Sequence, residues 1–143
     1  MVKILSEADN KRIVEAIRRA EGCTTGEIRV HIKSVGRGDI LERAKKTFRF
    51  LRMHKTRRRN AVLIFIDPKS RQFAILGDAG IHALAGSNFW HNTRDSMTAH
   101  FTQGRIVEGI VAGIENAGQE LRTHFPTLEK DNPNELVNEV TEG

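Results

Sequence analysis

The chain has 143 residues, which suits one domain, and 38% are hydrophobic and 29% charged, a globular composition that excludes a disordered chain. Its longest apolar run, residues 61–66, is far shorter than the roughly 20 residues that a membrane span needs. The sequence therefore predicts a protein without a membrane-spanning helix.

The formal net charge of +5 is unevenly distributed. Residues 127–143 hold five acids against one lysine, a net of −4, so residues 1–126 carry +9. A basic body attracts anions such as phosphate groups, nucleic acid or an acidic protein surface. We therefore expect a domain at residues 1–126 and an acidic, flexible C-terminal tail at residues 127–143.

Two features favour a cytoplasmic location. The N-terminal residues lack the apolar region of a signal peptide. Cys23 is the single cysteine and cannot form an internal disulfide, which suits a reducing compartment.

The first elements are a helix and a strand. Ser6 is a good helix N-cap, with Asp9 three residues later as in a capping box, and apolar residues then recur at helical spacing. Gly22 is expected to end this helix as a left-handed cap. Glu27–Lys33 alternates between polar and apolar residues, which predicts a strand with one solvent-exposed face.

A second helix and a hairpin follow. Asp39 supplies the next cap, and the apolar stripe of that helix consists of Leu41, Ala44, Phe48 and Leu51. Ala61–Ile66 is apolar at every position, which predicts a strand covered on both faces. Gln72–Gly77 should pair antiparallel to it after the turn at Asp67–Ser70.

Three further helices are expected at Asp78–Leu84, Asn88–Phe101 and Arg105–His124. The strand–helix–strand unit should have parallel strands. The fold class is therefore α/β, a three-layer αβα sandwich with a small mixed sheet that combines a parallel βαβ unit and an antiparallel hairpin strand.

Several stretches, in this order and spacing, resemble the TPM domain family, whose members include thylakoid-lumen phosphatases and photosystem II repair proteins. The similarity covers residues 4–125 and rests on Leu5-Ser6, Thr24-Thr25-Gly26-Glu27, Arg59-Asn60-Ala61-Val62-Leu63, the segment 73–81, and Phe101-Thr102-Gln103-Gly104 with Gly109-Ile110. The resemblance implies an αβα sandwich and, for some members, acid phosphatase activity with a divalent-cation site.

The chain departs from the family pattern at two carboxylates. The family has an aspartate shortly before the first helix, where this chain has Val2-Lys3-Ile4, and another after the third strand, where it has Leu84-Ala85-Gly86. The chain thus resembles a divergent, cytoplasmic bacterial-type branch with an altered metal site.

The loop after the third strand supplies the candidate for a metal or catalytic site. Asp78 could ligate calcium or magnesium, with Asn60 adding an oxygen, and Asp78 is also the candidate catalytic acid of a metal-assisted phosphatase. Alternatively, Asp78 caps the short helix. The chain has no His-x3-His pair, which argues against a zinc site.

Residues 43–59 form a basic run of nine Lys and Arg residues without an acid. It is either an anion-binding patch or a solvated helix face, and Arg43, Lys46 and Arg49 are expected to point outward. The candidate ligand-binding residues are Arg57, Arg58, Arg59 and Asn60. The chain has no tyrosine, so stacking platforms for nucleic acid are poorly supplied.

Three functions follow in order of preference. The first is a non-catalytic binding or interaction module whose basic surface attracts an anionic partner or phosphorylated ligand. The alternatives are a weak divalent-metal-assisted acid phosphatase and a non-specific nucleic-acid-associated protein. The tail could dock a partner, mask the basic run or remain untethered.

Overall fold

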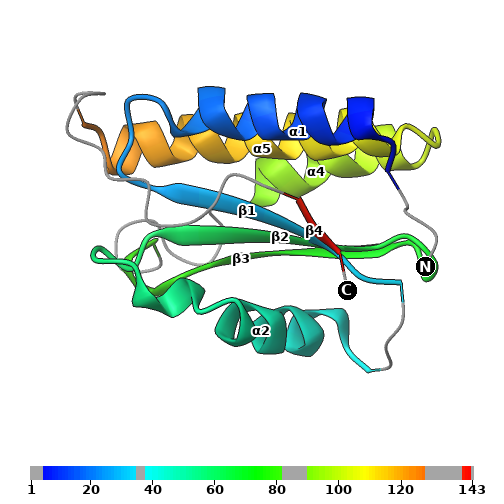
Figure 1. Ribbon diagram of the computed structural model, residues 1–143, viewed down its shortest axis with the longest axis horizontal. Coiled ribbons are helices and arrows are strands. Elements are labelled where there is room, and N and C mark those ends of the chain that lie inside the picture. The colour runs from blue at the N-terminus through cyan, green and yellow to red at the C-terminus, as the bar shows by residue number, and fades with distance from the viewer. Residues whose placement is uncertain (1–4, 35–37, 82–89, 128–139, 143) are drawn as a thin grey trace.

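The computed structural model describes residues 5–34, 38–81, 90–127 and 140–142. A sheet forms the middle of three layers, with helices on both of its faces (Figure 1). In chain order the elements are α1 (Glu7–Glu21), β1 (Glu27–Ile32), α2 (Ile40–Phe50), η1 (Met53–Lys55), β2 (Ala61–Asp67), β3 (Gln72–Gly77), α4 (His91–Phe101), α5 (Ile106–His124) and β4 (Val140–Glu142). The predicted α/β sandwich with a mixed sheet is confirmed.

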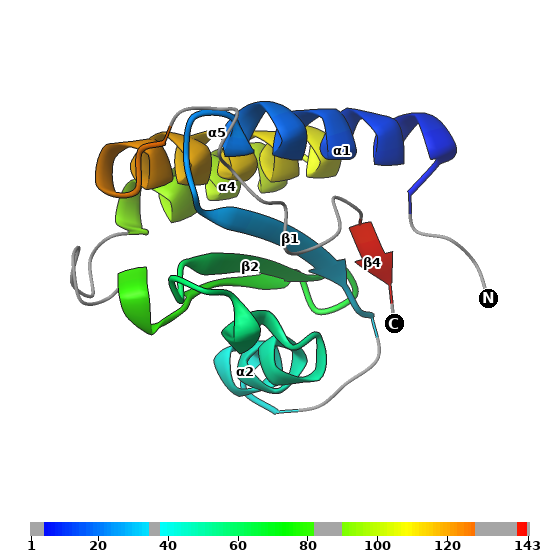
Figure 2. The same ribbon diagram turned by 60° about the vertical axis from the view of Figure 1, so that its left-hand side comes forward.

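The sheet has the strand order β3-β2-β1-β4. Strand β1 pairs parallel with β2, and β2 pairs antiparallel with β3, both as predicted. Strand β4 pairs parallel with β1 at the sheet edge, and Figure 2 shows it beside that strand. The sequence predicted no strand in this part of the acidic segment.

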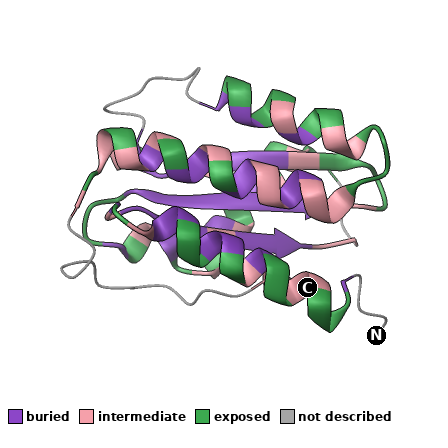
Figure 3. Ribbon diagram, turned by 90° about the horizontal axis from the view of Figure 1, so that it is seen from above, coloured by how far each residue is buried: buried purple, intermediate pink, exposed green. Residues whose placement is uncertain are grey.

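Strand β2 lies at the centre because both of its faces are apolar and both are covered. Val62, Ile64 and Ile66 join the larger core under α1, α4 and α5. Ala61, Leu63 and Phe65 join a smaller core under α2. Figure 3, seen from above, shows largely buried strands beneath the helices. Side chains alternate along a strand, so a continuous apolar run fills both cores.

The N-terminal caps form as predicted. The Ser6 hydroxyl accepts from the Asp9 amide while the Asp9 carboxylate accepts from the Ser6 amide, which completes a capping box at α1. The Asp39 carboxylate caps α2 by accepting from the amide of Glu42.

Two local predictions about the helices are wrong. Gly22 ends α1 in an extended conformation, and the left-handed residue is the next one, Cys23, with φ 65°. On α2 the apolar stripe starts at Ile40, one turn before Ala44, whereas Leu41 is exposed.

The exposed face predicted for β1 is also wrong. Glu27 and His31 are buried; the His31 ring stacks on Phe65 of the neighbouring strand at 5.8 Å between centroids, and its Nδ1 bonds the Thr141 hydroxyl of β4. Polar residues therefore line an interior surface here, where they require partners.

The remaining predictions concern the helices after β3. Residues 79–81 are helical, while residues 82–84 of the expected short helix lie outside the described residues. The same holds for residues 88 and 89 of the next helix, whose described part is α4. Within the described ranges, every helix is too short or too polar to span a bilayer.

Candidate functional site

Asp78 and Arg59 form a bidentate ion pair at the end of β3. Arg59 Nε donates to Asp78 Oδ2 at 2.8 Å, and Arg59 Nη2 donates to Asp78 Oδ1 at 2.9 Å. The Asp78 side chain is 6% exposed and that of Arg59 is 51% exposed. The hydrogen bond and the charge of Asp78 raise the pKa of Arg59 above its ordinary value. The pair thus fixes the orientation of a half-exposed cation.

The backbone around the pair explains its position. Arg59 adopts a left-handed conformation, φ 52°, and its carbonyl accepts from the Gly80 amide at 2.8 Å. A Cβ at Gly80 would lie 2.7 Å from the Arg59 carbonyl oxygen and closer still to that of Arg58. Glycine is therefore required for this close approach of the two loops.

The Asn60 side chain bonds the turn before β1. It is buried, and its Nδ2 donates to the Thr25 hydroxyl at 3.0 Å. This hydrogen bond joins the loop before β2 to the turn before β1. Sequence analysis grouped Asn60 with Asp78, but their side-chain bonds lead to different elements.

The divalent cation that the family resemblance implies does not fit the candidate pair. Both Asp78 oxygens accept from Arg59, and Oδ1 also accepts from the Ala79 amide at 2.7 Å. Calcium takes about six to eight oxygen ligands, and a guanidinium already neutralises this carboxylate. Across the described ranges, no group of three or more His, Cys, Asp or Glu side chains is arranged to hold a metal ion.

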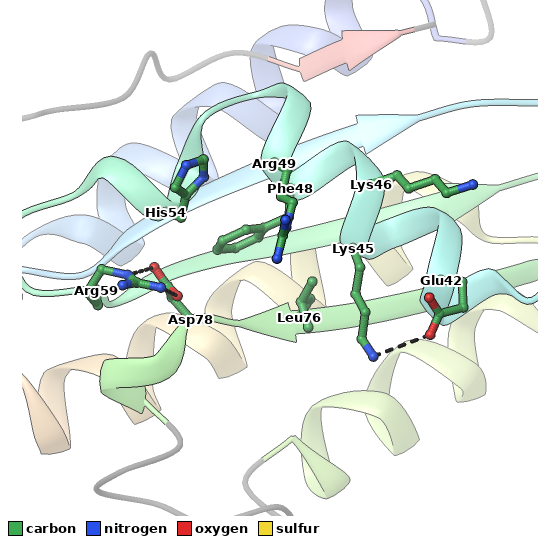
Figure 4. Close-up of a pocket in the computed structure, with 9 residues that line it drawn as sticks. All are labelled: Glu42, Lys45, Lys46, Phe48, Arg49, His54, Arg59, Leu76 and Asp78. Atoms are coloured by element: carbon green, nitrogen blue, oxygen red, sulfur yellow. Dashed lines mark hydrogen bonds and ion pairs between the residues drawn. The ribbon is translucent and has the colours of Figure 1, made fainter.

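A groove of about 630 Å³ opens between α2 and the end of β3, beside the Asp78–Arg59 pair (Figure 4). Leu76 of β3 and Asp78, just after the strand, contribute to one wall. Helix α2 contributes Lys45, Lys46 and Arg49. The complete lining is Glu42, Lys45, Lys46, Phe48, Arg49, His54, Arg59, Leu76 and Asp78.

The groove has an excess of positive charge. Its two acids are each engaged by a cation: Asp78 by Arg59, and Glu42 by Lys45 at 3.4 Å. Lys46 and Arg49 are exposed and have no carboxylate partner among the residues that the structure describes. Two uncompensated cations and the oriented Arg59 make the groove suited to an anion.

The other members of the basic run separate into two groups. Arg43, predicted to point outward, points inward instead: its Nη1 donates to Asp67 Oδ2 at 2.7 Å and its guanidinium lies over the Phe65 ring. Burial opposes ionisation of Asp67, but hydrogen bonds from Arg43 and Ser70 outweigh it and lower the pKa of Asp67. Arg57 and Arg58 are exposed in the loop before β2.

Sequence analysis missed His54 and Leu76 as lining residues. Leu76 follows Ala74 by two positions, and residues two apart share a face of a strand, so alternation along β3 could have placed Leu76 on the same side as Ala74. His54 lies in η1 and carries no comparable signal.

The chain was compared with known families and structures. A family model of the TPM domain matches residues 1–120. A search of the curated proteins finds no match. The NMR structure of the BA42 protein from the psychrophilic bacterium Bizionia argentinensis is similar at 39% identity with a TM-score of 0.93. That similarity covers 100% of this chain and 98% of BA42.

Two more distant structures share the fold. The N-terminal domain of the cg2496 protein from Corynebacterium glutamicum has a TM-score of 0.66 at 17% identity, covering 82% of this chain and 74% of that one. The N-terminal domain of a P. gingivalis protein has a TM-score of 0.68 at 21% identity, with 85% and 79% coverage. At such identities the similarity is evidence for the fold alone.

Proposed function

The chain belongs to the TPM domain family, and from this premise we propose that it is a non-catalytic module that binds a phosphate-bearing anionic ligand in the groove between α2 and β3. The observation that carries the proposal is the arrangement of the groove cations. Lys46 and Arg49 border the groove without a carboxylate partner in the described residues, and Asp78 holds Arg59 at its end.

The geometry of Arg59 supports recognition of phosphate in particular. Its bonds to Asp78 use Nε and Nη2, so Nη1 is not used by the pair. The bonds to Asp78 already order the Arg59 side chain in the folded protein, so its guanidinium loses less rotational freedom when it binds an anion. Asp78 is therefore a positioning residue in this proposal, and Arg57 and Arg58 extend the basic surface beyond the groove.

Hydrolysis is the less favoured function because the candidate acid is engaged. A general base or metal ligand needs an accessible oxygen, and the buried Asp78 accepts three hydrogen bonds from Arg59 and Ala79. We expect no hydrolysis of a chromogenic phosphate ester above that of an Asp78→Ala variant, with or without calcium or magnesium. Activity that the wild type has and Asp78→Ala lacks would restore the phosphatase function.

The binding experiment uses inorganic pyrophosphate as a probe, titrated calorimetrically into the full chain at low salt. The Lys46→Ala/Arg49→Ala double variant should lose affinity about tenfold or more, since each charged contact contributes on the order of 1 kcal/mol. Raising the salt concentration should weaken binding by the wild type, because exposed charges are screened.

The matched control is Lys11→Ala/Arg12→Ala, which also removes one lysine and one arginine. Both residues are exposed on α1, in the layer on the opposite side of the sheet from α2 (Figure 1). The control should bind pyrophosphate like the wild type. Equal losses in the two double variants would mean that net charge, and not the groove, determines binding.

A further inference from the structure

Phe50, the last residue of α2, is the most exposed large apolar side chain in the described part of the structure, at 82%. Phe48, two residues earlier, is 6% exposed and belongs to the smaller core. Residues two apart lie on opposite sides of a helix, so Phe50 projects away from the sheet. Because the ring remains in contact with water, Phe50 contributes little hydrophobic free energy to folding.

Cations surround Phe50. Lys46 lies one turn before it on the same side of α2, and Arg49 and Arg52 are its near neighbours in the chain; all three are exposed. Arg52 adopts a left-handed conformation, φ 58°, where the chain leaves the helix. We call Lys46, Arg49, Phe50 and Arg52 the α2 crest. It combines one protruding aromatic ring with three positive charges.

We infer that the α2 crest docks the domain on an anionic phospholipid surface, with the Phe50 ring entering the headgroup region. This inference rests on the proposed function, since the phosphate that the groove receives is then that of a lipid headgroup. Lys46 and Arg49 belong to both the crest and the groove lining, so one surface contacts neighbouring headgroups. Clusters of Lys and Arg beside an apolar side chain are the elements that bind an anionic bilayer.

Charge complementarity and the single ring favour a lipid surface over the other anionic partners. Single-stranded nucleic acid is bound by several aromatic rings on which successive bases stack, and the crest offers one. Lysine and arginine can lay their apolar stems along an apolar surface while their charged ends remain in a hydrated headgroup layer.

The test measures binding of the full chain to sedimented vesicles. Vesicles containing phosphatidylserine should bind the wild type, and vesicles of phosphatidylcholine alone should bind it at least about tenfold more weakly. Phe50→Ala should lower affinity for the anionic vesicles about tenfold and leave affinity for pyrophosphate unchanged. Leu41→Ala, the matched control, removes the other exposed large apolar side chain of α2 and should retain vesicle binding.

The double variant Lys46→Ala/Arg49→Ala should bind anionic vesicles about thirtyfold more weakly, in addition to its weaker binding of pyrophosphate. Pyrophosphate binding without vesicle binding overturns the lipid surface and leaves the groove proposal intact. Vesicle binding that depends on Phe50, without pyrophosphate binding, supports the crest and refutes the groove. Equal binding of both vesicle types, or tighter binding to a single-stranded oligonucleotide than to anionic vesicles, also overturns the inference.

Discussion

Mild acid should destabilise the fold through His31 of β1, which is buried against the Phe65 ring and the Thr141 hydroxyl. The Thr141 hydroxyl donates its one proton to the Val30 carbonyl at 3.2 Å, so it accepts from His31 Nδ1 at 2.7 Å. His31 Nδ1 therefore carries a proton, and the ring is neutral where the pH lies above its pKa. Burial lowers its pKa from the ordinary 6.5 to about 4, with smaller contributions from the positive charges of Lys33 and Arg29.

The direction of the pH effect follows from the two pKa values. Between pH 6.5 and pH 4 the unfolded chain binds a proton at His31 and the folded chain does not, so acid favours unfolding. Above pH 6.5 both states are neutral and the effect vanishes. One pKa unit corresponds to about 1.4 kcal/mol, so the full loss by pH 4 is on the order of 3 kcal/mol, and about 2 kcal/mol of it falls between pH 7 and pH 5.

Urea unfolding at both pH values measures this loss, with His31→Gln as the reference because glutamine retains a hydrogen-bonding group and does not titrate. The wild type should lose about 2 kcal/mol more than the variant between pH 7 and pH 5. Asp67 does not interfere, since its lowered pKa affects stability only below the ordinary 3.8. The same pH dependence in both proteins would refute the buried, neutral histidine.

Two further predictions concern stability, measured by urea unfolding. Gly80→Ala should cost about 1–3 kcal/mol and disturb the Arg59–Asp78 pair, because its Cβ would meet the backbone carbonyls of Arg58 and Arg59. As a control, Ala79→Ser at the exposed neighbouring position should change stability by less than about 0.5 kcal/mol. A Gly80→Ala variant as stable as the wild type would contradict the close approach of the two loops. Thr24→Val should cost about 1–3 kcal/mol, because valine keeps the shape but loses the hydroxyl, which accepts from the Gly26 amide and donates toward the Phe125 carbonyl at 2.7 Å and the Leu121 carbonyl at 3.0 Å. A cost below about 0.5 kcal/mol would refute this hydrogen-bond role.

The sequence predicted those parts of the fold that local patterns determine. The capping box of Ser6 and Asp9 involves residues three apart, and the apolar run of β2 is continuous, so each can be recognised without knowledge of the tertiary structure. Strand β4 could not be found in this way. It has three residues, and its partner β1 lies about 110 positions away in the chain.

The sequence predicted several residues of the candidate site, but it did not predict how their side chains pair. Arg59 and Asp78 were both candidates, as a phosphate contact and as a metal or catalytic group, whereas the structure joins them in one ion pair. Arg43 belonged to the basic run by sequence, but Asp67, 24 residues later, draws it inward. Such pairings depend on which strand lies beside which helix, and charge patterns along the chain do not contain that information.

Mapping the site of anion binding tests the central claim most directly. In a series of amide NMR spectra recorded as pyrophosphate is added at low salt, the account predicts shifts that saturate and concentrate at Lys45, Arg49, Arg59 and their neighbours along the groove. Residues of α1, on the far side of the sheet, should remain unshifted. Shifts confined to the α1 layer, or no saturable shifts at the groove, would contradict the account.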